Sequence, residues 1–152
     1  MFDTIYGWFS SLFGGDLDSY LLGRICPTDT TEESWGASHY VMYGLIALGI
    51  ALAVMLIYYY VINHPRFNKW WSWMLMMLLV GVSNLLVGAG ITLGDLGAGE
   101  IGDCMINSEN GGIHDYNCWM FGLANFFLSA IFFILFSFAF KWWSTNCKRT
   151  PV

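Results

Sequence analysis

The chain has 152 residues, of which 57% are apolar and only 11% are charged, whereas about a quarter of the residues of a soluble domain are charged. This length allows one domain and leaves no room for a separate soluble one. The net charge of −5 arises from eleven acidic and six basic residues. An excess of acidic residues disfavours nucleic acid as a partner.

Residues 1–38 are predicted to form an arm that precedes the first long apolar run. Apolar residues at helical spacing predict a short amphipathic helix that lies at the membrane interface; they are Phe2, Ile5, Tyr6, Phe9, Leu12 and Phe13. Gly14 and Gly15 end this helix, and a second short helix ends at Gly23. The arm lacks the basic face of autonomous membrane binders, so we expect it to pack over helices of its own bundle or of a neighbour. A polar linker, residues 27–34, follows.

Three apolar runs without Asp, Glu, Lys or Arg follow the arm: residues 39–62, 70–93 and 119–140. Each exceeds the roughly 20 residues that cross about 30 Å of hydrocarbon. A tight turn at residues 63–69 makes the first two runs an antiparallel hairpin, because the residue before Pro65 avoids the helical region. The sequence therefore predicts an all-α integral membrane protein whose three-span transmembrane domain covers residues 39–143. Residues 94–118 form its outer loop, and residues 144–152 a short basic tail.

The ionisable residues are sorted by the apolar runs. All acidic residues precede the first run or lie between the second and third; they are Asp3, Asp16, Asp18, Asp29, Glu32, Glu33, Asp95, Glu100, Asp103, Glu109 and Asp115. Five basic residues lie on the other side; they are Arg66, Lys69, Lys141, Lys148 and Arg149, and only Arg24 departs from the pattern. Because loops beside the cytoplasm retain Lys and Arg, we expect a multi-pass protein with its N-terminus outside and its C-terminus in the cytoplasm. In a bacterium this membrane is the inner membrane.

Three of the four cysteines lie on the predicted outer side, where disulfides persist. Cys104 and Cys118 bracket a short loop, so a bridge between them is the simplest pairing. Cys26 is the alternative partner for either, and an odd outer cysteine is also compatible with a free thiol or a link between protomers. Cys147 lies on the inner side.

Small and polar residues form a stripe along the second run and a matching one along the third. The residues are Gly81, Asn84, Gly88 and Thr92, with Ser83 beside them, and then Gly122, Asn125 and Ser129. Small residues let helix backbones approach closely, and Asn84 and Asn125 lie at similar depths where their amides can bond between helices. This pattern predicts helix packing, within or between protomers. The alternative is a water-filled pore lined by the same residues.

Motifs of enzymes and metal sites are scarce. The sequence has no HExxH, GxSxG or Walker motif, and the acidic residues of the outer loop lack the dense alternation of an EF-hand. We therefore expect no catalytic residue, no metal site and no cofactor. The apolar runs contain no charged residue, which disfavours proton relays and ion-coupled transport.

We expect a structural or interaction subunit of an oligomeric membrane complex, with a homo-oligomeric ring as one form. Its partners are the lipid bilayer and either copies of itself or other membrane subunits, with no nucleic acid. The alternative is a passive, cation-preferring channel lined by the stripe of the second run. A third hypothesis is a thiol or metal enzyme on the outer face, where His114 and Asp115 lie near Cys104 and Cys118 in the sequence.

Overall fold

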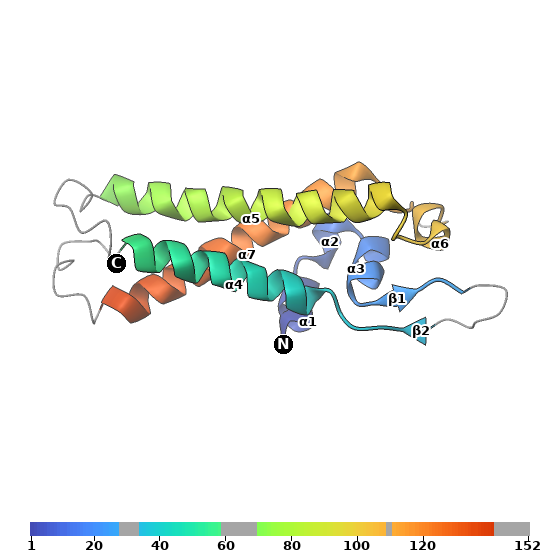
Figure 1. The fold of residues 1–152 in the computed structure, drawn as a ribbon, viewed down its shortest axis with the longest axis horizontal. Helices are drawn as coiled ribbons and strands as arrows, with labels where there is room; N and C mark the ends of the chain where they lie inside the picture. Colours follow the sequence, from blue (N-terminus) through green and yellow to red (C-terminus); the bar gives the residue numbers. More distant parts are fainter. Residues whose placement is uncertain (28–33, 59–69, 109–110, 142–152) are drawn as a thin grey trace. The chain divides into compact units, whose positions relative to one another are not determined.

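The computed structural model describes residues 1–27, 34–58, 70–108 and 111–141. It divides into two compact units: Met1–Leu45 with Leu85–Ala124, and Ile46–Asn84 with Asn125–Val152. Three long helices, α4 (Tyr40–Leu56), α5 (Trp70–Ala98) and α7 (Asp115–Lys141), contribute residues to both units (Figure 1).

Among the described residues, two helices, α5 and α7, are long and apolar enough to cross a membrane. With 29 residues, α5 is about 44 Å long at 1.5 Å per residue. Helix α4 has 17 residues and is about 26 Å long, and a π-helical turn begins at Ile57. The end of the predicted first span (59–62) and the turn at residues 63–69 lie outside the described residues.

Residues 94–118, the predicted outer loop, are in part helical. Helix α5 continues to Ala98, a short helix α6 covers Asp103–Ile106, and α7 begins at Asp115. A charged residue such as Asp95 ends an apolar run but does not end a helix. Helix α5 ends where Gly99 adopts a φ of 74°, with the Gly99 N–H bonded to the Leu96 carbonyl and the Glu100 N–H bonded to the Asp95 carbonyl. These two bonds form a Schellman motif.

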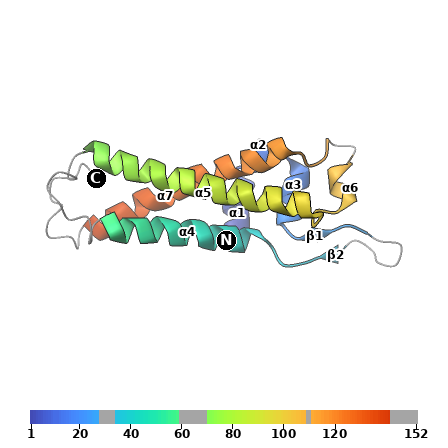
Figure 2. The same cartoon turned by 45° about the horizontal axis from the view of Figure 1, so that its top comes forward.

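The N-terminal arm of the first unit folds as three short helices, α1 (Phe2–Gly7), α2 (Ser10–Phe13) and α3 (Gly15–Leu21). Of the predicted apolar stripe, Phe2, Tyr6 and Phe13 are buried, whereas Leu12 is exposed. Glycine separates α2 from α3, because Gly14 has a φ of 91° that other residues rarely adopt. Figure 2 shows α6 beyond the last turn of α5, and α3 and α6 are in contact.

A two-stranded antiparallel sheet joins the arm to α4, so the prediction of a wholly helical fold was incomplete. Strand β1 (Arg24–Ile25) pairs with β2 (Ser34–Trp35) on either side of the predicted polar linker, of which residues 28–33 lie outside the described residues. Gly23 permits the pairing, because its φ is 93° and a Cβ there would lie 2.8 Å from the Ala37 carbonyl oxygen. We call the described residues of 1–39 and 99–114 the cap.

The second unit is built around an apolar core of its three helix segments. Its buried members are Ala51, Met55, Tyr58, Trp73, Val80 and Phe133. The indole of Trp73 packs against Phe133 with ring centroids 5.8 Å apart, and its Nε1–H donates to the Ser137 hydroxyl at 3.1 Å. This bond provides a buried indole N–H with the acceptor that it needs.

Glycine allows close helix contacts in each unit. In the second unit, a Cβ at Gly81 would lie 2.5 Å from the ring of Phe126. In the first unit, a Cβ at Gly122 would lie 2.7 Å from the Leu85 carbonyl oxygen and 2.9 Å from the Ala89 Cβ. Helices α5 and α7 therefore approach each other at positions that only a small residue allows.

Gly122→Ala should destabilise the protein by about 1–3 kcal/mol, because the added methyl group overlaps backbone of α5 that cannot move freely. Gly90→Ala is the matched control on α5, since a Cβ at Gly90 has no atom within 4 Å. Thermal unfolding in detergent, followed by circular dichroism, should show a lower Tm for Gly122→Ala alone. Equal Tm values for the two variants would contradict the close approach.

Candidate functional site

The structure buries the predicted polar stripe. Asn84, Thr92, Asn125 and Ser129 are each at most 2% exposed, Gly81, Gly88 and Gly122 are also buried, and Ser83 is half-buried. Within each unit, therefore, the stripe faces neighbouring parts of the same chain. This burial is the arrangement expected for helix packing.

Polar side chains of the stripe bond to backbone carbonyls of their own helices. The Asn84 Nδ2 donates to the Val80 carbonyl at 3.0 Å, the Thr92 hydroxyl to the Gly88 carbonyl at 2.9 Å, and the Ser129 hydroxyl to the Phe126 carbonyl at 2.9 Å. These bonds provide buried donors with acceptors where no water competes. The proposed bond between the amides of Asn84 and Asn125 stays a prediction.

Four carboxylates of the first unit accept hydrogen bonds from hydroxyl groups that lie far away in the sequence. The pairs are Ser38 to Asp3, Ser108 to Asp16, Tyr40 to Asp18, and Tyr20 to Asp95. Hydrogen bonds to a charged group each stabilise a fold by about 1.5–3 kcal/mol. These carboxylates therefore hold the arm against the ends of the long helices. The sequence analysis treated them only as charges and missed this role, because nothing in their spacing pairs them with hydroxyls.

Tyr20 connects α3 to the end of α5. Its hydroxyl donates to the Asp95 carboxylate at 3.1 Å, and its ring stacks on His39 with centroids 5.2 Å apart. Burial, and next the negative charge of Asp95, raises the pKa of the Tyr20 hydroxyl above its ordinary value. The hydroxyl therefore stays protonated and continues to donate even at a pH where a free tyrosine ionises.

An aromatic cluster lies beneath the arm, with Phe121 of α7 at its centre. Phe13 and Tyr43 meet the ring of Phe121 edge-on, with centroids 5.4 and 4.9 Å away, and Tyr6 lies 5.7 Å away. Tyr6 in turn stacks on Tyr40 at 4.8 Å. Edge-to-face and offset-stacked pairs contribute about 0.5–1.5 kcal/mol each beyond the area that they bury. The arm is thus packed on helices of its own chain.

The cysteine pairing favoured by sequence spacing was wrong. A disulfide joins Cys26, which follows β1, to Cys104 of α6, with Cα atoms 6.0 Å apart. Cys118 is instead buried in α7 as a free thiol. Closeness in the sequence did not predict the pairing, because the fold brings Cys104 of α6 next to the residue that follows β1. The bridge spans 78 residues, and closing such a loop stabilises a fold by about 4.5 kcal/mol in the chain-entropy model. Cys147 lies outside the described residues.

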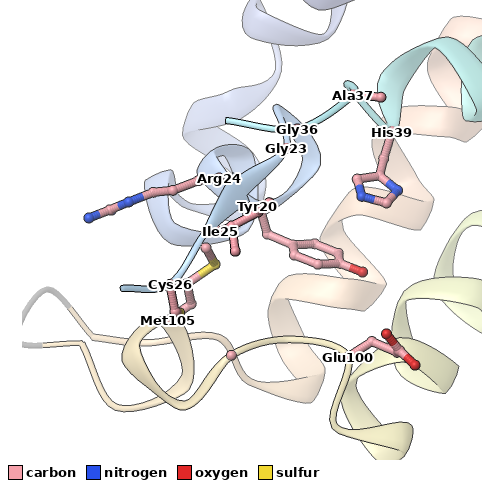
Figure 3. Close-up of a pocket in the computed structure, with 11 residues that line it drawn as sticks. Tyr20, Gly23, Arg24, Ile25, Cys26, Gly36, Ala37, His39, Glu100 and Met105 are labelled. Carbon is pink, nitrogen blue, oxygen red and sulfur yellow. The ribbon is translucent and has the colours of Figure 1, made fainter. Parts of the chain in front are cut away.

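The cap contains a cleft of about 550 Å³, shown in Figure 3. One side is apolar and consists of Ile25, Met105 and the disulfide at Cys26, and the other holds Tyr20, His39 and Glu100. Its volume is in the range of small-molecule sites. In the part of the chain that the structure describes, no group of three or more His, Cys, Asp or Glu side chains is placed to hold a metal ion.

Comparisons of the chain with models of protein families, with curated proteins and with solved structures find no match. The function is therefore inferred from the residues themselves. Two features bear on it. One is the burial of the polar stripe in the helices, and the other is the cap with its hydrogen-bonded carboxylates, disulfide and cleft.

Tyr40→Phe should destabilise the first unit by about 1–2 kcal/mol, because the partly buried Asp18 carboxylate loses its hydroxyl donor. Tyr116→Phe is the control: that side chain is 63% exposed, and its loss of a hydroxyl should change stability by less than about 0.5 kcal/mol. Unfolding in detergent measures both. In a double-mutant cycle, Tyr40→Phe and Asp18→Asn should be non-additive by at least about 0.5 kcal/mol. Additive effects would show that the two side chains do not interact.

Proposed function

We propose that the chain is a three-span integral membrane protein that serves as an interaction subunit of an oligomeric membrane complex. The observation that carries this proposal is the distribution of side chains on the long helices. Polar residues such as Asn84 and Asn125 are buried, whereas large apolar side chains are exposed at helical spacing. The exposed residues include Leu75, Leu78, Leu79 and Val82 on α5, and Phe127, Ile131, Leu135 and Phe138 on α7. Lipid or other apolar helices are the surroundings that such faces require.

The disulfide supports α4 as the third span. Cys26 and Cys104 must lie on the same side of a membrane to be joined, so the chain between them crosses it an even number of times. Helix α5 supplies one crossing, and α4 is the other apolar helix described in this interval. Its 17 residues fall a few residues short of the usual length, and the apolar sequence continues to residue 62.

The disulfide also supports the orientation. Disulfides persist outside the cytoplasm, so the cap lies on the outer side, together with the N-terminus. The sorting of Lys and Arg in the sequence gives the same orientation independently. The C-terminus is then cytoplasmic, since three crossings separate it from the cap.

The assembly role rests on the exposed faces. The cap, with exposed Trp8 and Trp35, and the exposed Trp119 at the start of α7 offer contacts outside or at the edge of the hydrocarbon. The alternative, a cation channel lined by the stripe of α5, is disfavoured by the burial of Asn84 and Thr92 within the chain. The thiol-enzyme hypothesis is weakened too, because Cys26 and Cys104 are joined and Cys118 is buried.

The orientation is tested in intact cells with a maleimide that does not cross membranes. Thr4→Cys, at an exposed position in α1 and made in a Cys147→Ser background, should be labelled from outside. Native Cys147 should be labelled only after the cells are opened. Labelling of Cys147 in intact cells would refute the three-span topology.

Assembly through the exposed face of α7 is tested by cysteine crosslinking in membranes, also in the Cys147→Ser background. Ile131→Cys, at a position 46% exposed, should give a covalent dimer or a crosslink to a partner. Leu128→Cys is the matched control at a buried position of the same helix, and it should stay monomeric. A chain that remains monomeric by native mass spectrometry in nanodiscs, co-purifies with no partner and gives no crosslink from Ile131→Cys is not an assembly subunit. Conductance in planar bilayers would favour the channel instead.

A further inference from the structure

The cleft of the cap is lined by three separate segments of the first unit. They are Tyr20–Cys26, which ends α3 and forms β1, the segment 36–39 before α4, and residues 100–105, which follow α5 and enter α6 (Figure 3). The Cys26–Cys104 disulfide fixes the first of these to the third. The segment before α4 is fixed to the first by backbone bonds, in which the Gly36 N–H donates to the Gly23 carbonyl and the His39 N–H to the Leu21 carbonyl. The cleft is therefore a preformed feature.

Negative charge is concentrated at the Tyr20 end of the cleft. In the Schellman motif that ends α5, the Glu100 backbone N–H donates to the Asp95 carbonyl. The Asp95 carboxylate accepts a hydrogen bond from the Tyr20 hydroxyl. Both carboxylates lie near enough to the Tyr20 hydroxyl to help raise its pKa, and that of Glu100 lines the cleft and is exposed. The one basic side chain of the lining, Arg24, points away from Tyr20, His39 and Glu100 in Figure 3.

The other walls are apolar and aromatic. Ile25 and Met105 lie beside the disulfide, opposite the Tyr20 ring that stacks on His39. A carboxylate beside an aromatic ring recognises a cation that is poorly hydrated, because ring and carboxylate both attract positive charge while the apolar wall accepts hydrocarbon. A metal ion does not fit this chemistry, since it needs several oxygen or nitrogen ligands at once.

We propose that the cleft binds an organic ammonium ion with an apolar body, with its ammonium group at Glu100 and its hydrocarbon against Ile25 and Met105. The acidic cap increases the local concentration of such cations. The site lies wholly within the first unit, so it does not depend on the assembly proposed above. The same ammonium chemistry is offered by a soluble amine and by an ethanolamine lipid headgroup.

The binding test uses the full chain in detergent and ligand-observed saturation-transfer NMR. The probe is 2-phenylethylammonium, and the neutral 2-phenylethanol and the anionic phenylacetate are controls of matched shape. The ammonium ion should bind saturably and the two controls should bind at least about tenfold more weakly, as expected when a charge-assisted hydrogen bond is lost. Equal binding of all three compounds, or none at 10-millimolar probe, would overturn the proposal.

Three variants at two positions locate the site. Glu100→Gln should weaken binding of the probe by about tenfold, and Glu100→Asp should restore part of the affinity. Asp115→Asn removes the same charge from an exposed position outside the cleft lining and should change the affinity less than about twofold. Both positions are exposed, so the three variants should fold, and an unchanged Tm confirms this. Equal effects of Glu100→Gln and Asp115→Asn would show attraction by overall charge and not a site.

A competition experiment distinguishes the two sources of the ligand. The probe is titrated into nanodiscs made with phosphatidylethanolamine or with phosphatidylglycerol alone. If the headgroup occupies the cleft, the ethanolamine lipid should weaken binding of the probe, and Glu100→Gln should abolish the difference between the lipids. Equal affinity in the two lipids assigns the site to a soluble amine.

Discussion

Polar groups carried by apolar helices must find partners within the protein, and this constraint shapes the polar stripe. Asn84, Thr92 and Ser129 satisfy this requirement by donating hydrogen bonds to carbonyls of their own helices. Glycines at Gly81 and Gly122 then let neighbouring helices cover those groups. Because small and polar residues occupy the contacts between helices, large aliphatic side chains remain on the outside. The surface that results is unsuited to water, and the proposal of a membrane subunit rests on that surface.

In the cap, the polar groups that need partners are mainly acidic side chains, and they find them on other segments of the chain. The carboxylates of Asp3, Asp16 and Asp18 on the arm each accept a hydrogen bond from a hydroxyl of another segment. The Asp95 carboxylate, at the end of α5, accepts one from Tyr20 on the arm. Electrostatic bonds thus join the segments that the aromatic cluster around Phe121 packs together. These acidic side chains thus organise the arm. The negative charge at the Tyr20 end of the cleft comes in part from the Asp95 carboxylate of this arrangement.

The sequence predicted what depends on local composition. The apolar runs located α5 and α7, and Gly14 and Gly23 correctly marked the breaks in the arm. What depends on distant contacts was not predictable. The cysteine pairing failed because loop length says nothing of where β1 brings Cys26, and the end of α5 was missed because Asp95 was taken as a boundary. The cleft has no sequence pattern, since three segments far apart in the chain create it.

The bridge between Cys26 and Cys104 imposes an order on biosynthesis. Cys26 emerges from the ribosome early, but its partner follows 78 residues later, after both helices of the predicted hairpin. In a three-span topology the two sulfurs meet only once that hairpin has been inserted and Cys104 has been translocated. In that topology the bridge would mark insertion of the hairpin, but not of α7, which follows Cys104 in the chain. A chain with one helix in the bilayer would hold its two thiols on opposite sides of the membrane, so the bridge could not form.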